Sequence, residues 1–199
     1  MLNCAGLRAH IKDIRSDPCL NKADVLNFVE TSLDKNSATD DLQIAGYESN
    51  FLKVSRGKGI ASFVKGNSLA IEKNFVENGI QISKYTSSDL IIVVVYRSQN
   101  GNIRTLLEIL SELFAEMKSI LIFGDFNICN KKNSENAVKV TLIKEGFQLL
   151  IKESTQIMGG HIDHAYWRNF EDFFVNPSIE RYSPYFSDHD ALCISLIKK

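Results

Sequence analysis

Apolar residues recur at helical spacing in three segments of the chain. The first segment, 7–14, stops before Pro18, because proline disfavours helical geometry in the residue before it. In the second segment, apolar residues between 103 and 117 fall on one helical face, which predicts a helix packed on a core. The third segment, 134–145, begins at a serine suited to cap a helix and is followed by Gly146, a common terminator. The pattern therefore predicts three helices.

Short apolar runs rich in β-branched residues surround these helices and predict strands. The run 25–29 ends at Glu30, and the run 119–128 is expected to break at Gly124. The other expected strands are 58–64, 74–83, 89–98, 147–151, 161–167, 170–175 and 191–197. Strands outnumber helices, and most helices have strands on either side. This order predicts an α+β or α/β layered domain, in which two sheets pack together with helices outside.

Composition and charge limit the range of functions. With 199 residues, of which 44% are hydrophobic, the chain is long enough for one sizeable core, and we expect a single domain over 1–199. The 23 basic and 24 acidic residues nearly cancel, so any contact with nucleic acid must be local. No apolar run approaches the length that spans a membrane. The start of the chain does not resemble a signal peptide, so we expect a protein that is not secreted, in the nucleus or cytoplasm.

Polar side chains gather at the predicted ends of strands, where rigid scaffolds present functional groups. They are Glu30, Tyr96, Asp125, Asn127, Asp163, Asp188 and His189. Taken singly, each has a structural explanation, such as a solvated strand end or a turn that bonds its own backbone. Taken together, carboxylates with one amide and one imidazole form an oxygen-rich site that suits Mg²⁺ or Mn²⁺ rather than zinc. A metal-bridged phosphate and a group that orients water are the needs of phosphodiester hydrolysis.

The motifs that carry these residues resemble a known family. IFGDFN (122–127), HIDHAY (161–166) and FSDHDAL (186–192) follow NCAGL (3–7) and DVLNFVETSL (24–33) in this order. The chain resembles the endonuclease/exonuclease/phosphatase superfamily, which includes DNase I and the apurinic endonucleases. Its nearest likeness is to the endonuclease domains of non-LTR retrotransposons and related mobile elements. The resemblance implies a four-layer αββα sandwich of two mixed sheets flanked by helices.

The resemblance also implies a role for each polar residue. Glu30 matches the family's Mg²⁺ ligand, for which Mn²⁺ is an expected substitute. Asn3 matches an asparagine near the metal, and Asp188 is expected to support the metal site.

Further residues match the family's catalytic and substrate-binding groups. Asp125 matches the aspartate that orients or deprotonates the attacking water, Asn127 its neighbour on the phosphate, and Tyr96 a tyrosine that contacts the scissile phosphate. Asp163 matches the carboxylate that pairs with His189. The sequence leaves open whether Asp125 or His189 takes the proton of the water.

Three basic residues are candidates for substrate binding: Arg97, which follows Tyr96, and Lys131 and Lys132, which follow the GDFN motif.

One departure from the family concerns the first strand. Only Met1 and Leu2 precede Asn3, so the first strand is expected to be short and the domain N-terminally truncated, as a monomer or part of a larger polyprotein. We expect a Mg²⁺-dependent phosphodiester hydrolase, a DNA endonuclease that nicks its target. Two alternatives stay open: a remnant of the fold that acts as a binding module, and a phosphodiesterase or phosphatase on a substrate other than DNA.

Overall fold

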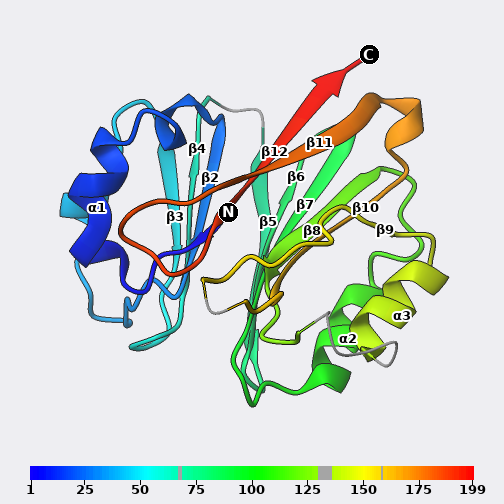
Figure 1. The fold of residues 1–199 in the computed structure, drawn as a ribbon, viewed down its shortest axis with the longest axis horizontal. Coiled ribbons are helices and arrows are strands. Elements are labelled where there is room, and N and C mark those ends of the chain that lie inside the picture. The colour runs from blue at the N-terminus through cyan, green and yellow to red at the C-terminus, as the bar shows by residue number, and fades with distance from the viewer. Residues whose placement is uncertain (67–68, 130–135, 158) are drawn as a thin grey trace.

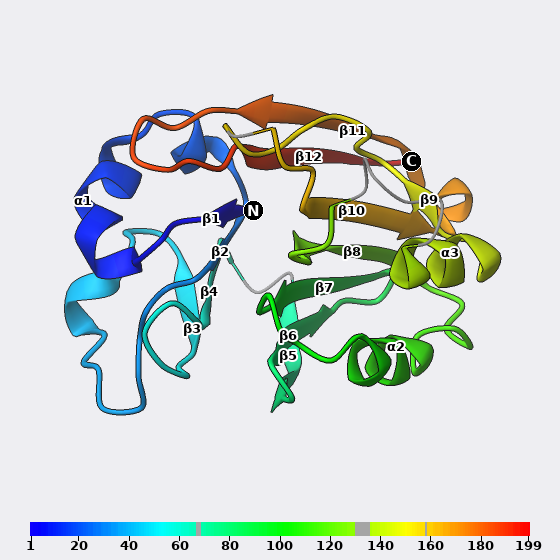
Figure 2. The same ribbon diagram turned by 60° about the horizontal axis from the view of Figure 1, so that its bottom comes forward.

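Two β-sheets lie face to face at the centre of the molecule, and helices cover their outer sides (Figures 1 and 2). This computed structural model describes residues 1–66, 69–129, 136–157 and 159–199. The first sheet has the order β1-β2-β4-β3 and consists of β1 (Leu2–Asn3), β2 (Val25–Val29), β4 (Ile60–Val64) and β3 (Glu48–Leu52). β1 runs parallel to β2, and the other pairs are antiparallel. The predicted short first strand is therefore present as a two-residue pairing at one edge.

The second sheet has the order β5-β6-β7-β8-β10-β9. Its strands are β5 (Ala70–Glu77), β6 (Ile80–Thr86), β7 (Leu90–Arg97), β8 (Ser119–Asp125), β10 (Asp163–Arg168) and β9 (Gln148–Leu149). Only β7 and β8 run parallel, because α2 connects them, and the other neighbours are antiparallel. Both sheets are thus mixed, as expected.

A long hairpin crosses from one sheet towards the other. β11 (Phe174–Tyr182) and β12 (Ala191–Lys198) pair antiparallel with each other (Figure 1). Its link to the first sheet is a backbone pair, in which the Leu192 amide donates to the Met1 carbonyl and the Met1 amine to the Leu192 carbonyl, both at 2.8 Å. The loop between β11 and β12 carries the predicted SDH motif.

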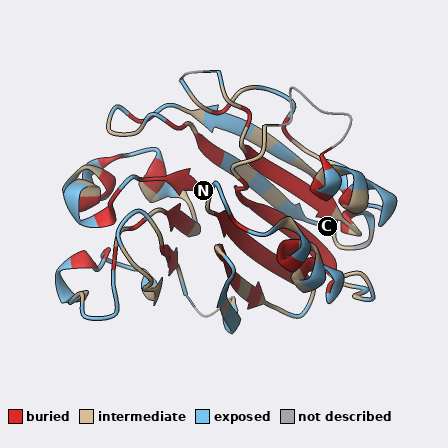
Figure 3. Ribbon diagram, turned by 90° about the horizontal axis from the view of Figure 1, so that it is seen from below, coloured by how far each residue is buried: buried red, intermediate tan, exposed pale blue. Residues whose placement is uncertain are grey.

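Three apolar clusters separate the layers. One lies between the two sheets, with side chains from β2, β4, β6, β7, β8, β10 and β12. A second packs α2 (Ile103–Ser111) and α3 (Ala137–Lys144) on the second sheet. A third packs α1 (Leu7–Ser16) and the 3₁₀ turns η1 (Leu20–Lys22) and η2 (Asp40–Leu42) on the first sheet. Figure 3 shows the buried residues concentrated on the strands and on the inward faces of the helices. The predicted layered α+β sandwich is therefore confirmed.

The single strand predicted for 74–83 is wrong, because this segment holds the turn of the β5–β6 hairpin. Asn78 and Gly79 both adopt positive φ, at 48° and 78°. An Asn-Gly pair with two positive φ angles matches the twist of a two-residue hairpin turn, so the chain reverses here rather than continuing.

Other boundaries also differ from the prediction. β8 runs through Gly124 instead of breaking there. The side chain of Asn136 caps α3 by accepting from two backbone amides, while Ser134, the expected cap, lies outside the described residues. The expected strand 170–175 opens with the 3₁₀ turn η3 (Phe170–Asp172) and becomes β11 only at Phe174. No described helix is both long and apolar enough to cross a membrane.

Candidate active site

Several strand ends meet at one edge of the two sheets. Since β7 and β8 are parallel and in register, Tyr96 lies opposite Asp125. The antiparallel strand β10 begins beside the end of β8, so Asp163 is also opposite Asp125. β1 and β2, also parallel, end with Asn3 and just before Glu30. The topology therefore brings predicted residues from both sheets to this edge.

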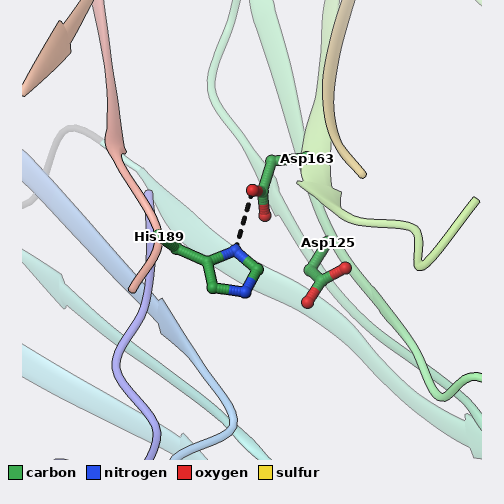
Figure 4. Close-up of side chains that lie close together, drawn as sticks. All are labelled: Asp125, Asp163 and His189. Carbon is green, nitrogen blue, oxygen red and sulfur yellow. Dashed lines mark hydrogen bonds and ion pairs between the residues drawn. The ribbon is translucent and has the colours of Figure 1, made fainter. Parts of the chain in front are cut away.

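Three of these residues form a buried cluster (Figure 4). His189 Nδ1 lies 2.9 Å from Asp163 Oδ2, and the two groups form a buried ion pair when the ring is protonated. Asp125 completes the cluster, with one ligand atom of each residue within 4.8 Å of the others. Asp125 and Asp163 come from adjacent strands, whereas His189 comes from the loop before β12. In Figure 4 the second ring nitrogen of His189 lies on the side of Asp125.

Two asparagines hold the Asp125 carboxylate. Asn3 Nδ2 donates to Asp125 Oδ2 at 3.0 Å, and the Asn127 amide donates to Asp125 Oδ1 at 2.9 Å. The Asn127 side chain does not point into the same contact, because its Nδ2 donates to the Arg97 carbonyl at 2.8 Å. Each Asp125 oxygen thus has a fixed donor, and the carboxylate keeps one orientation.

Glu30 and Tyr96 meet next to this cluster. The Tyr96 hydroxyl lies 2.9 Å from Glu30 Oε1 and 3.0 Å from the Gly57 carbonyl oxygen, so two acceptors compete for its one proton. Burial, and then the charge of Glu30, raise the pKa of Tyr96 far above its ordinary value. The hydroxyl therefore remains a hydrogen-bond donor throughout the neutral range.

Burial and neighbouring charges shift the pKa values of Asp125 and His189 in the cluster. Burial in the first place, and then the charge of Asp163, raise the pKa of Asp125 to about 7, while His189 acts in the opposite direction. For His189, burial favours the neutral ring, but the hydrogen bond to Asp163 and the surrounding carboxylates outweigh it and raise its pKa to about 9. At neutral pH, His189 and Asp163 therefore form an imidazolium–carboxylate pair.

Several residues with strained backbone conformations lie close to the ends of strands. Among the described residues, six that are not glycine have positive φ, and four of these stand within three residues after the ends of β1, β2 and β8: Ala5, Glu30, Ser32 and Asn127. Such conformations cost about 1–3 kcal/mol each and persist where the surroundings fix them, often at functional sites. This places the strain at the same edge as the cluster.

The donor set fits a divalent cation. Asp163 Oδ1 is buried and has no hydrogen-bond partner in the described part of the chain, which leaves a carboxylate oxygen without a counter-group. The side chains around it offer mainly carboxylate oxygens, which are ligands for hard cations such as Mg²⁺. Asp188 lies further out, because it is exposed and its Oδ2 accepts from Gln156 Nε2 at 3.5 Å.

The predicted substrate-binding residues have other surroundings. Arg97 is buried, and its guanidinium donates to the carbonyls of Gly101, Gln99, Phe126 and Asn127 at 2.9–3.3 Å. Its contacts thus brace the loop after Asp125, and its charge interacts with Asp125 without a direct hydrogen bond between the two side chains in the described part of the chain. Lys131 and Lys132 lie outside the described residues.

A turn that sequence reasoning did not single out supports the cluster. In the turn 154–160, the amides of Thr155 and Gln156 both donate to the Gly160 carbonyl. Thr155 Oγ1 accepts from the Asp163 amide at 3.3 Å, and the Thr155 carbonyl accepts from the Asp190 amide at 2.7 Å. The turn therefore ties the start of β10 to the loop before β12. No local sequence pattern predicts these two hydrogen bonds, because the partners of Thr155 lie 8 and 35 residues away along the chain.

Ser187 is a second supporting residue. Its hydroxyl donates to the Asn3 carbonyl at 2.7 Å and accepts from the His189 amide at 3.0 Å. It thus links the SDH motif to the end of β1, and its place next to Asp188 and His189 in the motif was the available signal.

The sequence matches no protein-family model and no curated protein. Solved structures do resemble it. The endonuclease domain of TRAS1, a telomere-specific non-LTR retrotransposon, is 15% identical with a TM-score of 0.68, and the match covers 99% of this chain and 95% of that one. An AP endonuclease from Archaeoglobus fulgidus is 14% identical with a TM-score of 0.72, over 98% and 97%. A mannosyl-6-phosphatase from Bacteroides thetaiotaomicron is 10% identical with a TM-score of 0.65, over 98% and 97%.

The chain has the DNase I-like fold. This confirms the resemblance to endonuclease/exonuclease/phosphatase proteins that the motifs indicated. The proteins with the DNase I-like fold that match it include two endonucleases and a sugar phosphatase, so the shared fold gives neither the activity nor the substrate of this chain.

Proposed function

We propose that this protein is a metal-dependent phosphodiesterase that nicks DNA. The observation that carries the proposal is the buried hydrogen bond between His189 and Asp163 beside the oriented carboxylate of Asp125. A buried imidazolium held through Nδ1 by a carboxylate has a fixed orientation and presents its Nε2–H as a donor, which is the arrangement of a phosphate donor or a general acid.

A divalent cation fits this proposal. The residues that would hold it are Asp125 and Asp163 of the cluster with Glu30 beside Tyr96, and Asp188 and Asn3 stay predicted members of the site. When bound, Mg²⁺ would neutralise charge on the phosphate and stabilise the charge that develops during hydrolysis.

The protein's own residues have separable tasks. Asp125, fixed by Asn3 and Asn127, orients the attacking water and receives its proton. His189, held through Nδ1 by Asp163, donates from Nε2 to a phosphate oxygen. Tyr96 keeps its proton and donates to Glu30, and its contact with the scissile phosphate stays a prediction from the sequence. The proposal thus assigns the proton of the water to Asp125, a choice between Asp125 and His189 that the sequence left open.

The test is nicking of supercoiled plasmid by the purified protein, with Mg²⁺ and with chelator. We expect metal-dependent relaxation that His189→Ala and Asp125→Asn lower by about 10²–10⁴-fold, the usual contribution of a positioned acid or base. Asp40→Asn is a matched control, since Asp40 is exposed on η2, and it should retain full activity.

Two results would contradict the proposal. Undiminished nicking by both site variants would remove the cluster from catalysis. No nicking by folded parent protein would favour the alternatives predicted from the sequence, which are a non-catalytic binding module or a different phosphoester. Hydrolysis of a small phosphomonoester, assayed in parallel, separates these two.

A further inference from the structure

A basic turn lies directly against the candidate site. Residues 55–59 read Ser-Arg-Gly-Lys-Gly and are called here the SRGKG turn. The carbonyl of Gly57, between the two basic residues, lies 3.0 Å from the Tyr96 hydroxyl, the group that also contacts Glu30. Arg56 and Lys58 are therefore the sequence neighbours of Gly57, the residue whose carbonyl contacts the site.

The turn is held in place by backbone contacts with the segment after β2. The Ser32 amide donates to the Lys58 carbonyl at 2.9 Å, and the Gly57 amide donates to Ser32 Oγ at 2.9 Å. Within the turn, the Lys58 amide donates to the Ser55 carbonyl at 3.1 Å.

The glycine at the end of the turn adds to this fixation. A Cβ on Gly59 would stand 2.4 Å from Thr31 Oγ1 and 3.0 Å from the Leu52 carbonyl, and φ at this position is +102°. The Gly59 amide also donates to Gln81 Oε1 at 2.7 Å. The backbone that carries the two cations is thus packed closely against both sheets and has a defined position.

The two cations are not engaged by the protein itself. Arg56 is exposed and Lys58 half-buried, and within the described ranges no ion pair or side-chain hydrogen bond uses either of them. Other cations of this region differ. Lys53 Nζ donates to the Ser37 carbonyl, Lys65 Nζ to the Asn21 carbonyl, and the Arg97 guanidinium is buried on backbone carbonyls.

The negative charge of the site favours cationic side chains nearby. Glu30, Asp125, Asp163 and Asp188 are four carboxylates in a protein whose formal net charge is -1, so a polyanion that approaches them meets repulsion. Cations fixed beside the site offset this repulsion and bind phosphates that neighbour the reacting one.

We propose that Arg56 and Lys58 of the SRGKG turn bind backbone phosphates that flank the scissile phosphate, so that the substrate is a nucleic-acid strand and not an isolated phosphoester. The inference rests on the proposed function for the location of the scissile phosphate. It adds a substrate-binding element that acts on the backbone and is therefore independent of base sequence.

The experiment measures binding apart from turnover. A fluorescent duplex oligonucleotide is titrated with protein in chelator, and anisotropy gives Kd at several salt concentrations. For Arg56→Ala/Lys58→Ala we expect Kd to rise about tenfold and the slope of log K against log salt to fall by about 1.8, since each lost phosphate contact removes about 0.9.

A control variant removes the same charge elsewhere. Lys144→Ala/Lys199→Ala changes two exposed lysines, one at the end of α3 and one just after the end of β12 that is opposite to the His189 loop. Kd and slope should stay at the parental values. Arg56→Lys/Lys58→Arg retains both charges and should retain the parental slope.

Activity supplies the second readout. With Mg²⁺, the double alanine variant should raise KM for DNA with little change in kcat, and hydrolysis of bis(p-nitrophenyl) phosphate, which has one phosphate, should be unchanged. An unchanged Kd and salt slope, or a parent protein that does not bind the duplex, overturns this inference. Normal binding without any cleavage by the parent overturns the proposed function instead and leaves the role of the turn supported.

Discussion

At the scale of single residues, burial sets the chemistry of the candidate site. Asp163 and His189 are almost fully shielded from water, and the unpartnered Asp163 Oδ1 makes their surroundings a strong site for positive charge. The exposed Asp188 lacks this shielding, although it is adjacent in the sequence. The residue types of the SDH motif therefore did not show that His189 is buried and Asp188 exposed, whereas the geometry of the loop does.

His164, next to Asp163, behaves in the opposite way. It is buried, its ring stacks on Phe126 at 4.7 Å between centroids, and its Nε2 lies 2.9 Å from the Ile128 carbonyl. Burial, and then the proximity of His161, lower the pKa of His164 to about 3. His164 is therefore a neutral histidine packed in the core. Both His164 and His189 follow an aspartate in the sequence, so this pattern did not predict that only His189 carries a charge.

This histidine predicts how stability depends on pH. Between pH 6.5 and 3 the unfolded chain binds a proton at His164 that the folded chain does not, so the free energy of unfolding must fall as pH falls. Relative to His164→Gln, the parent should lose about 2 kcal/mol between pH 7.5 and pH 5. Urea unfolding of both proteins at the two pH values measures this, and parallel pH profiles would be inconsistent with a buried neutral ring.

At the scale of elements, the apolar pattern was sufficient for most strands and helices. β2, β4 and β7 lie within the predicted ranges, and β12 exceeds its range by one residue, because their apolar runs are continuous. β3 (Glu48–Leu52) was missed because its sequence ESNFL has no such run, and it forms through pairing with β4. Its register partners lie on the next strand, 8 to 16 residues along the chain, so pairing with β4 and not a local apolar pattern determined this element.

Gly124 gives a prediction for β8. A Cβ at this position would stand 1.8 Å from the Val95 carbonyl oxygen and 2.7 Å from its carbon, on the neighbouring parallel strand. Gly124→Ala must push β7 and β8 apart next to Asp125, and we expect a loss of about 3 kcal/mol or more in the free energy of unfolding.

A second glycine serves as the control for this substitution. Gly46 has a positive φ of 83° but open space around its Cβ position. Gly46→Ala should therefore show only the backbone cost, about 1–2 kcal/mol. Denaturant unfolding compares the two, and equal losses would mean that the contact with Val95 is relieved without moving the strands.

At the scale of the whole molecule, the site depends on both sheets and on the hairpin. Asn3 and Glu30 come from the first sheet, Tyr96, Asp125 and Asp163 from the second, and His189 from the loop before β12. The order of motifs predicted this assembly because it resembles a known family. The apolar pattern alone gave two sheets and not their relative placement, which is determined by the core between them.

The core between the sheets should therefore affect activity more than the outer layers do. Leu192 belongs to the cluster between the sheets, and Leu110 to the cluster under α2, and both are buried. Leu192→Ala and Leu110→Ala should each lower the free energy of unfolding by about 2–5 kcal/mol. At a temperature where both variants are folded, we expect a lower kcat for DNA nicking only in Leu192→Ala, and equal kcat values would argue against coupling between sheet packing and site geometry.

The turn 154–160 has a consequence for how this protein can be altered. Its backbone closes on itself at Gly160. Its links to the rest of the molecule are made by the Ser154 carbonyl, by Thr155, by the Gln156 side chain, and by the backbone amide of Ile157, which donates to the Asp188 carbonyl. The Ile157 side chain is exposed and takes no part in these links. Replacing the Ile157 side chain therefore changes the surface beside the candidate site and leaves in place the contacts that hold the turn, so this position suits the attachment of a probe or a new binding group.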